Sequence, residues 1–301
     1  METQIGNLTN SFTNDAAKFL IHVGDIQSGQ TSMCRESFYK QAYDIFLQQS
    51  PLPTMMLAGD NDWNACPKAK DGWRKYASYF IGLEKSWAAH KTLGVKRWND
   101  VRPENFVFSI SGVLIVSVNL VGTPILDRNE WDQRNADNVF WVKKGVADYL
   151  KNDQGELRAV MVLGHAMMRP TIVSFFQGIR EIFMTNDGGY KEGFQIPVIY
   201  LHGDGHKFAI TNTAGVNGHK SKARQKFVKD LDWDQFTDIQ VDKGQLAPPI
   251  KIEVAGVKDP LLEVHNIDQY VLGDGLIRID RRGGHYQTKM KKKLPKKKKK
   301  K

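Results

Sequence analysis

The chain has 301 residues, of which 41% are hydrophobic, and it contains seven tryptophans and carries a formal net charge of +10. This composition excludes an intrinsically disordered protein, because it supplies enough apolar surface for a folded core. It also excludes a membrane-spanning helix, since no apolar run approaches the roughly 20 residues that a span needs, and no basic segment followed by an apolar one marks a signal peptide after Met1.

The first part of the chain alternates between strand-like and helix-like stretches. Residues 18–25 and 53–60 are apolar runs that predict buried strands, and both end in Gly-Asp. Apolar residues at helical spacing predict helices over 35–50 and 71–90. The expected apolar faces are Phe38, Ala42, Ile45 and Phe46 on the first helix, and Trp73, Tyr76, Phe80 and Leu83 on the second.

The middle of the chain adds a hairpin, a long helix and further strands. Residues 106–122 predict two strands around a Ser111-Gly112 turn, and 129–151 predict a helix. The apolar side of that helix is expected to carry Trp131, Ala136, Val139, Phe140, Val142 and Val146. Other strands are expected over 158–166, 195–206, 250–256 and 275–280. Strands separated by helices predict an α/β layered fold.

Four of the predicted strands end with a glycine followed by a side chain that can bind a metal. The endings VGD, AGD, LGH and HGD place Asp25, Asp60, His165 and Asp204 just beyond the strands. In open α/β sheets, ligands bind beyond the carboxyl ends of strands. One Gly-Asp ending is typical of a turn, but four such endings in one chain predict a site.

The candidate metal ligands are Asp25, Asp60, Asn61, His165, His202, Asp204 and His206. Carboxylate, imidazole and amide groups are ligands that suit divalent metals acting on phosphate esters. In this order, GD…GDND…GH…HGDGH, the motifs resemble those of the calcineurin-like metallophosphoesterases over 18–256. The usual motifs of that superfamily are D-x-H, G-D-x-x-D, G-N-H-D/E, a lone His and G-H-x-H. The chain is most similar to a branch written with G-D-N-D/E-W and H-G-D-x-H.

The resemblance implies an α/β fold with a metallophosphoesterase-like β-sandwich flanked by helices. The implied domain spans 18–286, after a polar segment at 1–17 and before a Lys-rich tail at 287–301. The D-x-H motif should lie upstream of Lys18 and is absent there. We therefore expect the chain to be N-terminally incomplete. Its localisation stays open, with secretion or an endomembrane location expected if residues are missing upstream.

The resemblance also implies two metal ions, drawn from Fe, Zn and Mn. Asp25 matches the residue that bridges the two ions, and His206 matches a ligand of the first. His165 and Asp204 match ligands of the second, although Asp204 stands where the superfamily has a histidine. His202 is a substitute candidate for that histidine, and a carboxylate can replace an imidazole as a ligand.

The GDND motif leaves two assignments open. Either Asp60 or Asn61 is the remaining ligand of the second metal, depending on the alignment. The histidine that usually protonates the leaving group corresponds to Asn61 or Asp62, so these two residues are the catalytic candidates. An asparagine cannot donate a catalytic proton, whereas a protonated aspartic acid can. Trp63 and Arg35 lie close to the motifs, and we expect packing for the first and solvation for the second.

The implied activity is metal-dependent hydrolysis of phosphate esters, either monoesters or diesters, by a binuclear centre that activates water. The alternative is a catalytically degenerate metallophosphoesterase-like protein that uses its tail to bind polyanions. Ten lysines between Lys289 and Lys301 equal the whole net charge of +10, so the rest of the chain is neutral. We expect at most weak contacts of this tail with polyanions or anionic membranes. A neutral body argues against a specific nucleic-acid-binding module.

Cys34 and Cys66 each closely follow one of the Gly-Asp strand ends. If those strands are neighbours, the two side chains meet at one edge of the sheet and a disulfide is feasible. Spacing alone favours two reduced thiols, and it suits no zinc site. A disulfide would point to secretion, as would use of Asn7 as a glycosylation acceptor.

Overall fold

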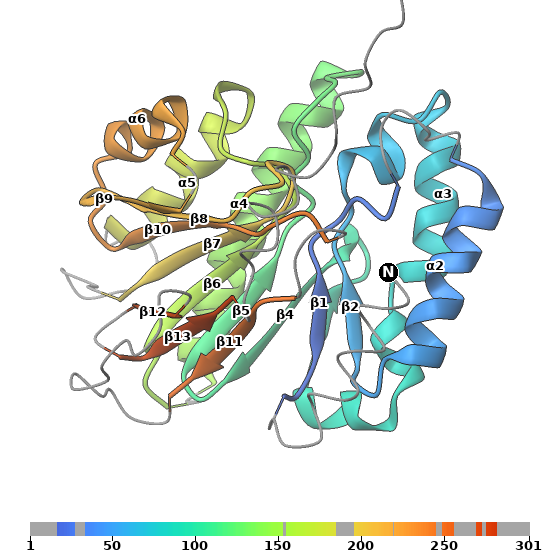
Figure 1. The fold of residues 1–301 in the computed structure, drawn as a ribbon, viewed down its shortest axis with the longest axis horizontal. Helices are drawn as coiled ribbons and strands as arrows, with labels where there is room; N and C mark the ends of the chain where they lie inside the picture. The colour runs from blue at the N-terminus through green and yellow to red at the C-terminus, as the bar shows by residue number, and fades with distance from the viewer. Residues whose placement is uncertain are drawn as a thin grey trace, which may run out of the picture.

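The structure is a computed structural model that describes residues 17–27, 34–152, 155–184, 196–218, 220–244, 249–255, 269–272 and 275–281 (Figure 1). Asn7, most of the polar N-terminal segment and the Lys-rich tail lie outside the described residues, so the predictions for them stay predictions. Among the helices that the structure describes, none combines the length and the apolar character needed to cross a membrane.

A mixed eight-stranded sheet lies at the centre of the fold (Figure 1). Its strands are β3 (Lys96–Trp98), β4 (Arg102–Ile110), β5 (Val113–Ser117), β6 (Ala159–Leu163), β7 (Val198–His202), β8 (Ala209–Asn212), β9 (Gly215–Gly218) and β10 (Phe236–Gln240). Their spatial order is β3-β4-β5-β6-β7-β10-β8-β9. β5, β6, β7 and β10 run parallel, whereas the outer strands pair antiparallel. The predicted α/β class is therefore confirmed.

The central strands are buried on both faces, which explains their sequences. Every residue of β5, β6 and β7 is buried, and strands of this kind are continuous apolar runs without alternation. The predicted hairpin between β4 and β5 is confirmed. Ser111 and Gly112 form its turn with φ angles of 48° and 79°, and two positive φ values match the twist of a tight hairpin.

Two smaller sheets lie beside the large one. The first pairs β1 (Leu20–His22) with β2 (Thr54–Met56) in parallel, and the second has β11 (Lys251–Val254), β12 (Gln269–Leu272) and β13 (Ile277–Asp280) in the order β11-β13-β12. Met161 and Leu201 of the large sheet belong to the same apolar cluster as Ile277 and Ile279 of β13. The three-stranded sheet thus covers one face of the large sheet.

The helices cover the remaining surfaces (Figure 1). They are α2 (Glu36–Gln49), α3 (Ala69–Phe80), α4 (Arg128–Lys151), α5 (Val173–Met184) and α6 (Lys222–Asp230), with the short helical turns η1 (Asp60–Asn64), η2 (Leu83–Ser86), η3 (Ala88–Leu93) and η4 (Pro170–Ile172). Val142 of α4 shares an apolar cluster with Val116 and Val162 of the large sheet. This cluster lies on the face opposite the three-stranded sheet. Figure 1 shows β1 and β2 between the large sheet and helices α2 and α3.

The predictions for the buried face of α2 and for the length of the helix over 71–90 were wrong in part. On α2, Phe38 is 39% exposed, and the neighbouring Tyr39 is buried in its place. The Tyr39 hydroxyl donates a hydrogen bond to the Asp62 backbone carbonyl (2.8 Å), which draws this side chain inward. The helix expected over 71–90 ends at Phe80, because Gly82 adopts a left-handed conformation with φ of 82° and terminates it.

Two further expectations need correction. The strand predicted over 18–25 spans only Leu20–His22 and is half-buried. The apolar side predicted for α4 is also wrong in part, since Ala136 is exposed and Phe140 is 55% exposed. Polar side chains occupy much of the buried face of α4, as described below.

Cys34 and Cys66 form a disulfide with a Cα–Cα distance of 5.9 Å. The prediction of two reduced thiols was therefore wrong. The reason is the pairing of β1 with β2 in parallel, because neighbouring parallel strands deliver the segments that follow them to the same edge. Spacing along the chain does not contain this information.

Candidate metal site

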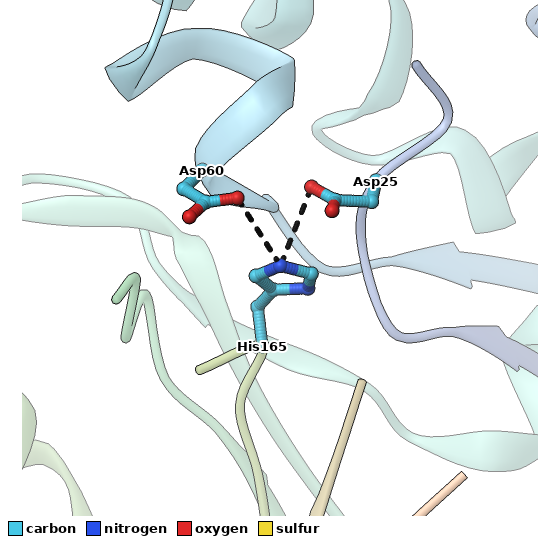
Figure 2. A group of neighbouring side chains, drawn as sticks. All are labelled: Asp25, Asp60 and His165. Carbon is cyan, nitrogen blue, oxygen red and sulfur yellow. Dashed lines mark ion pairs between the residues drawn. The ribbon is translucent and has the colours of Figure 1, made fainter. Parts of the chain in front are cut away.

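Three side chains from three strand ends converge on one point (Figure 2). Asp25 follows β1, Asp60 begins η1 after β2, and His165 follows β6. His165 Nε2 lies 3.3 Å from Asp25 Oδ1 and 3.5 Å from Asp60 Oδ1. The three potential ligand atoms lie within 4.8 Å of one another, and this is the one such group that the described ranges contain. Their spacing allows all three to bind a single ion.

The imidazole of His165 is oriented by the backbone. Its Nδ1 lies 2.7 Å from the Val23 carbonyl oxygen, so Nδ1–H donates and Nε2 faces the two carboxylates. The side chain is 1% exposed, and Nε2 has no hydrogen-bond partner among the described residues. A buried nitrogen aimed at two carboxylates, with its other nitrogen fixed by a carbonyl, is the arrangement of a metal-binding histidine.

Charge at the group shifts two pKa values. Burial lowers the pKa of His165, but the nearby carboxylates of Asp25 and Asp60 outweigh it and hold that pKa well above its ordinary value. For Asp25, burial raises the pKa, and the nearby His165 imidazole and the hydrogen bonds from Asn61 then bring it below the ordinary value. The two carboxylates therefore favour positive charge at this point, which a bound metal ion would also supply.

Asn61 binds Asp25 rather than facing the group. Its Nδ2 donates to Asp25 Oδ2 (2.8 Å), and its backbone N–H donates to Asp25 Oδ1 (3.2 Å). The GDND motif left Asp60 and Asn61 as alternative ligands. The structure places Asp60 in the group, whereas Asn61 hydrogen-bonds to the Asp25 carboxylate. Gly59 permits this approach, since a Cβ at Gly59 would collide with the backbone nitrogen and Oδ1 of Asp25.

Asp62 faces the backbone of two loops. Its carboxylate accepts hydrogen bonds from the N–H groups of Asp25 (2.8 Å), Ile26 (2.9 Å) and Gly59 (2.9 Å). Burial, followed by the charge of Asp25, raises the pKa of Asp62 to about 7. Asp62 therefore positions the loops that carry Asp25 and Asp60, and its oxygens are already engaged.

The HGDGH segment does not join the group. His202 Nε2 lies 2.9 Å from Asp238 Oδ1, and both side chains are fully buried. Asp204 Oδ2 accepts a hydrogen bond from the Met167 N–H (3.3 Å) and forms an ion pair with Arg169. His206 is exposed to solvent. Of the predicted ligands, the structure therefore assembles Asp25, Asp60 and His165, and it pairs His202 and Asp204 with other side chains.

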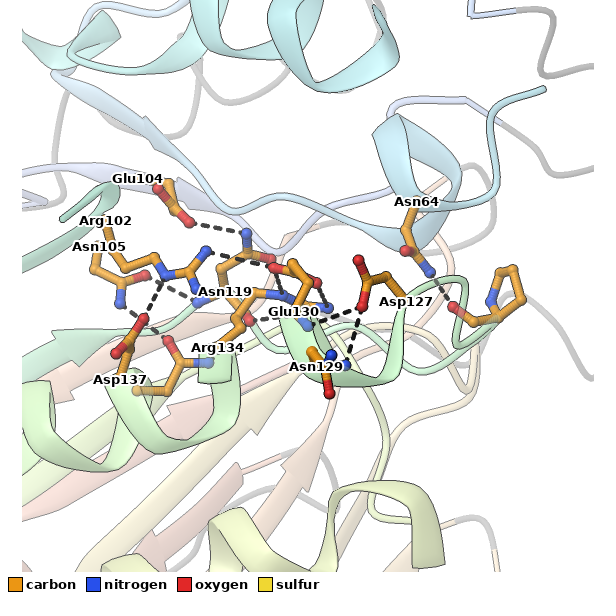
Figure 3. A network of polar contacts seen from close by, with 12 residues as sticks. Asn64, Arg102, Glu104, Asn105, Asn119, Asp127, Asn129, Glu130, Arg134 and Asp137 are labelled. Atoms are coloured by element: carbon orange, nitrogen blue, oxygen red, sulfur yellow. Dashed lines mark hydrogen bonds and ion pairs between the residues drawn. The ribbon is translucent and has the colours of Figure 1, made fainter. Parts of the chain in front are cut away.

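A polar network next to the site was missed by the sequence analysis (Figure 3). Arg134 of α4 is 1% exposed and donates to the Asn119 carbonyl (3.2 Å) and to the Glu130 carboxylate (2.9 Å). Its guanidinium also lies 5.2 Å from the ring of Trp63, which belongs to η1. The network therefore supports the turn that begins at Asp60. Its other members include Asn64, Arg102, Glu104, Asn105, Asp127, Asn129, Asp137 and Asn138.

The residues flanking the motifs behave as expected. Trp63 is 9% exposed and packs against Trp73 with a centroid distance of 5.1 Å, and Arg35 is exposed. Two partners were missed, namely Asp238 and Arg169. The sequence offered two signals for them. One is the aspartate within the segment FTDIQ, and the other is the arginine shortly after the lone histidine in LGHAMMR.

Comparisons with protein-family models, with curated proteins and with solved structures found no match to this chain. The resemblance to calcineurin-like metallophosphoesterases therefore stays a prediction from the order of its motifs. The structure adds a geometric observation that is independent of that resemblance. Asp25, Asp60 and His165, which are distant in the sequence, form one group of potential ligands.

Proposed function

We propose that the chain is a metal-dependent hydrolase of phosphate esters whose metal ion is held by Asp25, Asp60 and His165. One observation carries this proposal: two carboxylates and a buried imidazole nitrogen that faces them converge at three strand ends. Mixed oxygen and nitrogen ligands suit Zn, Mn or Fe. When bound, the metal would supply a Lewis acid for the phosphoryl oxygens and a water of lowered pKa.

The arrangement of layers supports the same proposal. The large sheet carries helices on one face and a smaller sheet on the other, and β1 and β2 lie between it and α2 and α3. This is compatible with a metallophosphoesterase-like β-sandwich flanked by helices. The proposed site lies at the carboxyl ends of β1, β2 and β6, where ligands of α/β proteins bind.

The proposal gives separate roles to the residues of the GDND motif. Asn61 holds Asp25 through two hydrogen bonds, and Asp62 holds the loops through backbone amides. Neither is placed to protonate a leaving group, because an amide is not an acid and the Asp62 oxygens face three N–H groups. We therefore expect esters with acidic alcohols, which leave without a general acid, to be the better substrates.

A non-catalytic metal-binding protein of the same architecture is the second candidate. It is favoured by Asn61 or Asp62 standing in place of the histidine that protonates the leaving group in the superfamily, and by the pairing of His202 and Asp204 with other residues. The two candidates share the metal site and differ in turnover. Metal binding without hydrolysis of any phosphate ester would favour this second candidate.

The test is hydrolysis of p-nitrophenyl phosphate by the full chain with Mn²⁺, measured alongside Mn²⁺ binding. Removing a ligand in His165→Ala or Asp60→Ala should abolish Mn²⁺ binding. It should also lower kcat/KM by more than about 10- to 100-fold, which is the loss typical when a residue that only supports a metal ligand is changed. Asp44→Asn removes an exposed carboxylate paired with Lys40 and should change neither quantity. Unchanged Mn²⁺ binding in both ligand variants would contradict the proposed site.

A further inference from the structure

The Cys34–Cys66 disulfide lies next to a residue that supports the proposed metal ligand Asp25. Cys34 Sγ is 4.0 Å from the backbone carbonyl oxygen of Asn61. Asn61 donates two hydrogen bonds to the Asp25 carboxylate, one from its side-chain Nδ2 (2.8 Å) and one from its backbone N–H (3.2 Å). Asn61 therefore connects a sulfur of the bridge to a proposed ligand of the ion.

The second sulfur contacts the same turn through a tyrosine. Cys66 Sγ lies 3.8 Å from the Tyr39 hydroxyl oxygen, and this hydroxyl donates a hydrogen bond to the Asp62 backbone carbonyl (2.8 Å). The Asp62 carboxylate in turn accepts hydrogen bonds from the N–H groups of Asp25 and Gly59. Both sulfurs of the bridge are thus connected by short contacts to the backbone around Asp25.

Reduction of the bridge would change these contacts. A covalent bond holds two sulfur atoms closer together than two separate thiols can approach, so reduction moves the sulfurs apart. A Cβ at Gly72 of α3 would lie only 2.4 Å from Cys66 Sγ, so the helix backbone limits the movement of that sulfur. A thiol also has an S–H donor that a disulfide lacks, and the Asn61 carbonyl is the acceptor next to Cys34.

A cavity of about 150 Å³, partly open to solvent, gives small molecules access to the bridge. Its lining consists of both cysteines with Pro67, Lys68, Asp71 and Lys75. Lys75 donates to the Cys34 carbonyl (3.1 Å) and forms an ion pair with Asp71 (2.8 Å). Two ammonium groups against one carboxylate make this lining positive, which favours the approach of a thiolate, the species that attacks a disulfide.

We propose that the Cys34–Cys66 bridge is a redox site whose reduction by a small dithiol weakens metal binding at Asp25, Asp60 and His165. This inference rests on the proposed function and adds regulation to it. One thiolate of the dithiol attacks a bridge sulfur, forms a mixed disulfide and displaces the other cysteine as a thiolate. The second thiol of the reductant then displaces the first cysteine. The reductant leaves as a cyclic disulfide, and its two electrons and two protons remain on the two cysteine thiols.

The test compares Mn²⁺ binding to the oxidised and the reduced full chain by calorimetry. Dithiothreitol reduces the protein without denaturant and is then removed under argon, and thiol titration verifies that both cysteines are free. Reduction should weaken Mn²⁺ binding by about 10- to 100-fold, the loss typical when a residue that supports a metal ligand is disturbed. Circular dichroism should show that the reduced chain stays folded, and reoxidation should restore the affinity.

Two variants test the contacts that carry the effect. The double variant Cys34→Ser, Cys66→Ser should bind Mn²⁺ like the reduced wild type and should not respond to dithiothreitol. Asn61→Ala should bind Mn²⁺ weakly even when oxidised and should lose most of its response to reduction, because its side chain no longer connects the bridge to Asp25. If the double variant does not fold, reversible reduction of the wild type still decides the question.

Ile279→Ala is the matched control for a loss of stability alone. Ile279 of β13 is fully buried and belongs to a different apolar cluster from the two cysteines. Its truncation should lower the midpoint of urea unfolding and leave the Mn²⁺ affinity of the oxidised chain unchanged.

Equal Mn²⁺ affinity of the oxidised and reduced chains would overturn the inference and leave the proposed function standing. The same conclusion would follow if the bridge resists dithiothreitol in the folded protein, if the reduced chain unfolds, or if Ile279→Ala loses as much affinity as reduction causes. Failure of both redox forms of the wild type to bind Mn²⁺ would refute the proposed function itself.

Discussion

At the scale of single residues, two of the Gly-Asp motifs, at Asp25 and Asp204, share an uncommon backbone conformation. Asp25 has a φ of 60°, Asp204 has a φ of 56°, and His206 has a φ of 61°. Left-handed backbone costs residues other than glycine about 1–2 kcal/mol each, and such positions gather at functional sites. Asp25 is thus both a residue of left-handed backbone conformation and a member of the group with Asp60 and His165.

His22 is predicted to make stability depend on pH. Its Nδ1 is buried without a hydrogen-bond partner among the described residues, and its ring meets Phe46 edge-on. Burial lowers the pKa of His22 from 6.5 to about 4, so the unfolded chain takes up a proton first as the pH falls. The contribution of neutral His22 to the free energy of unfolding is therefore fully present above pH 6.5 and is lost as the pH falls from 6.5 to about 4. From pH 7 to 5 we expect the half-buried ring to account for about 1–2 kcal/mol of this loss.

Urea unfolding of the wild type, His22→Gln and His22→Phe at pH 7 and pH 5 measures this contribution. Neither variant titrates at this position, so both should lose less stability than the wild type on acidification, whatever the difference in their packing at pH 7. Equal losses in all three proteins would show that His22 does not titrate as described.

At the scale of the element, α4 shows how a helix can bury a polar face. The helix begins at the N-cap Asp127, whose side chain accepts hydrogen bonds from the N–H groups of Asn129 and Glu130. Its buried face includes Arg134, Asn135 and Asn138 beside apolar residues. The polar groups are tolerated where partners satisfy them, as the Asn119 carbonyl does for Arg134. A hydropathy pattern cannot locate such a face, because the partners come from other elements.

Arg134→Met is predicted to lower the free energy of unfolding by about 2–3 kcal/mol. It removes three hydrogen bonds and the contact with the Trp63 ring, and it leaves Glu130 and the Asn119 carbonyl without this partner. Arg128→Met on the same helix removes an ion pair whose two side chains are 68% and 55% exposed. We therefore expect the free energy of unfolding to change by no more than about 0.5 kcal/mol. Chemical unfolding measures both, and similar losses in the two variants would contradict the importance given to the buried network.

At the scale of the whole molecule, the disulfide links the segments after β1 and β2. Cys34 and Cys66 are separated by 32 residues in sequence and enclose α2 and β2. Cys66 follows η1, and Asp62 within η1 accepts hydrogen bonds from the N–H groups of Asp25 and Gly59. The segment that begins at Asp60 is therefore linked to Asp25 by hydrogen bonds and, beyond its other end, to Cys34 by the disulfide.

Removing the bridge in the double variant Cys34→Ser, Cys66→Ser is predicted to destabilise the protein by about 3–4 kcal/mol, because the unfolded chain regains the entropy that a loop of this length loses. Thermal and urea unfolding measure the loss. Wild-type protein treated with a reductant should approach the stability of the variant. If neither the variant nor reduction changes the unfolding midpoint, the bridge does not contribute to the folded state.

Local features of the sequence predicted much of this fold. The strand ends at Asp25, Asp60, His165 and Asp204 were identified because an apolar run followed by glycine and a polar residue is information contained in a few neighbouring positions. The pairing of side chains is not local. His202 has Asp238 as its partner only because β7 and β10 are adjacent. The motif order thus predicted residues at strand ends, but it did not separate the three that meet from His202 and Asp204, which pair with other residues.

One consequence follows from the origin of the three proposed ligands. Asp25 and Asp60 come from the two-stranded sheet, and His165 comes from the eight-stranded sheet. An ion held by all three would link the two-stranded sheet to the eight-stranded sheet. Binding of the ion and the relative position of the two sheets would then be thermodynamically coupled. Displacement of one sheet against the other would weaken ion binding, and bound ion would oppose that displacement by the same coupling free energy.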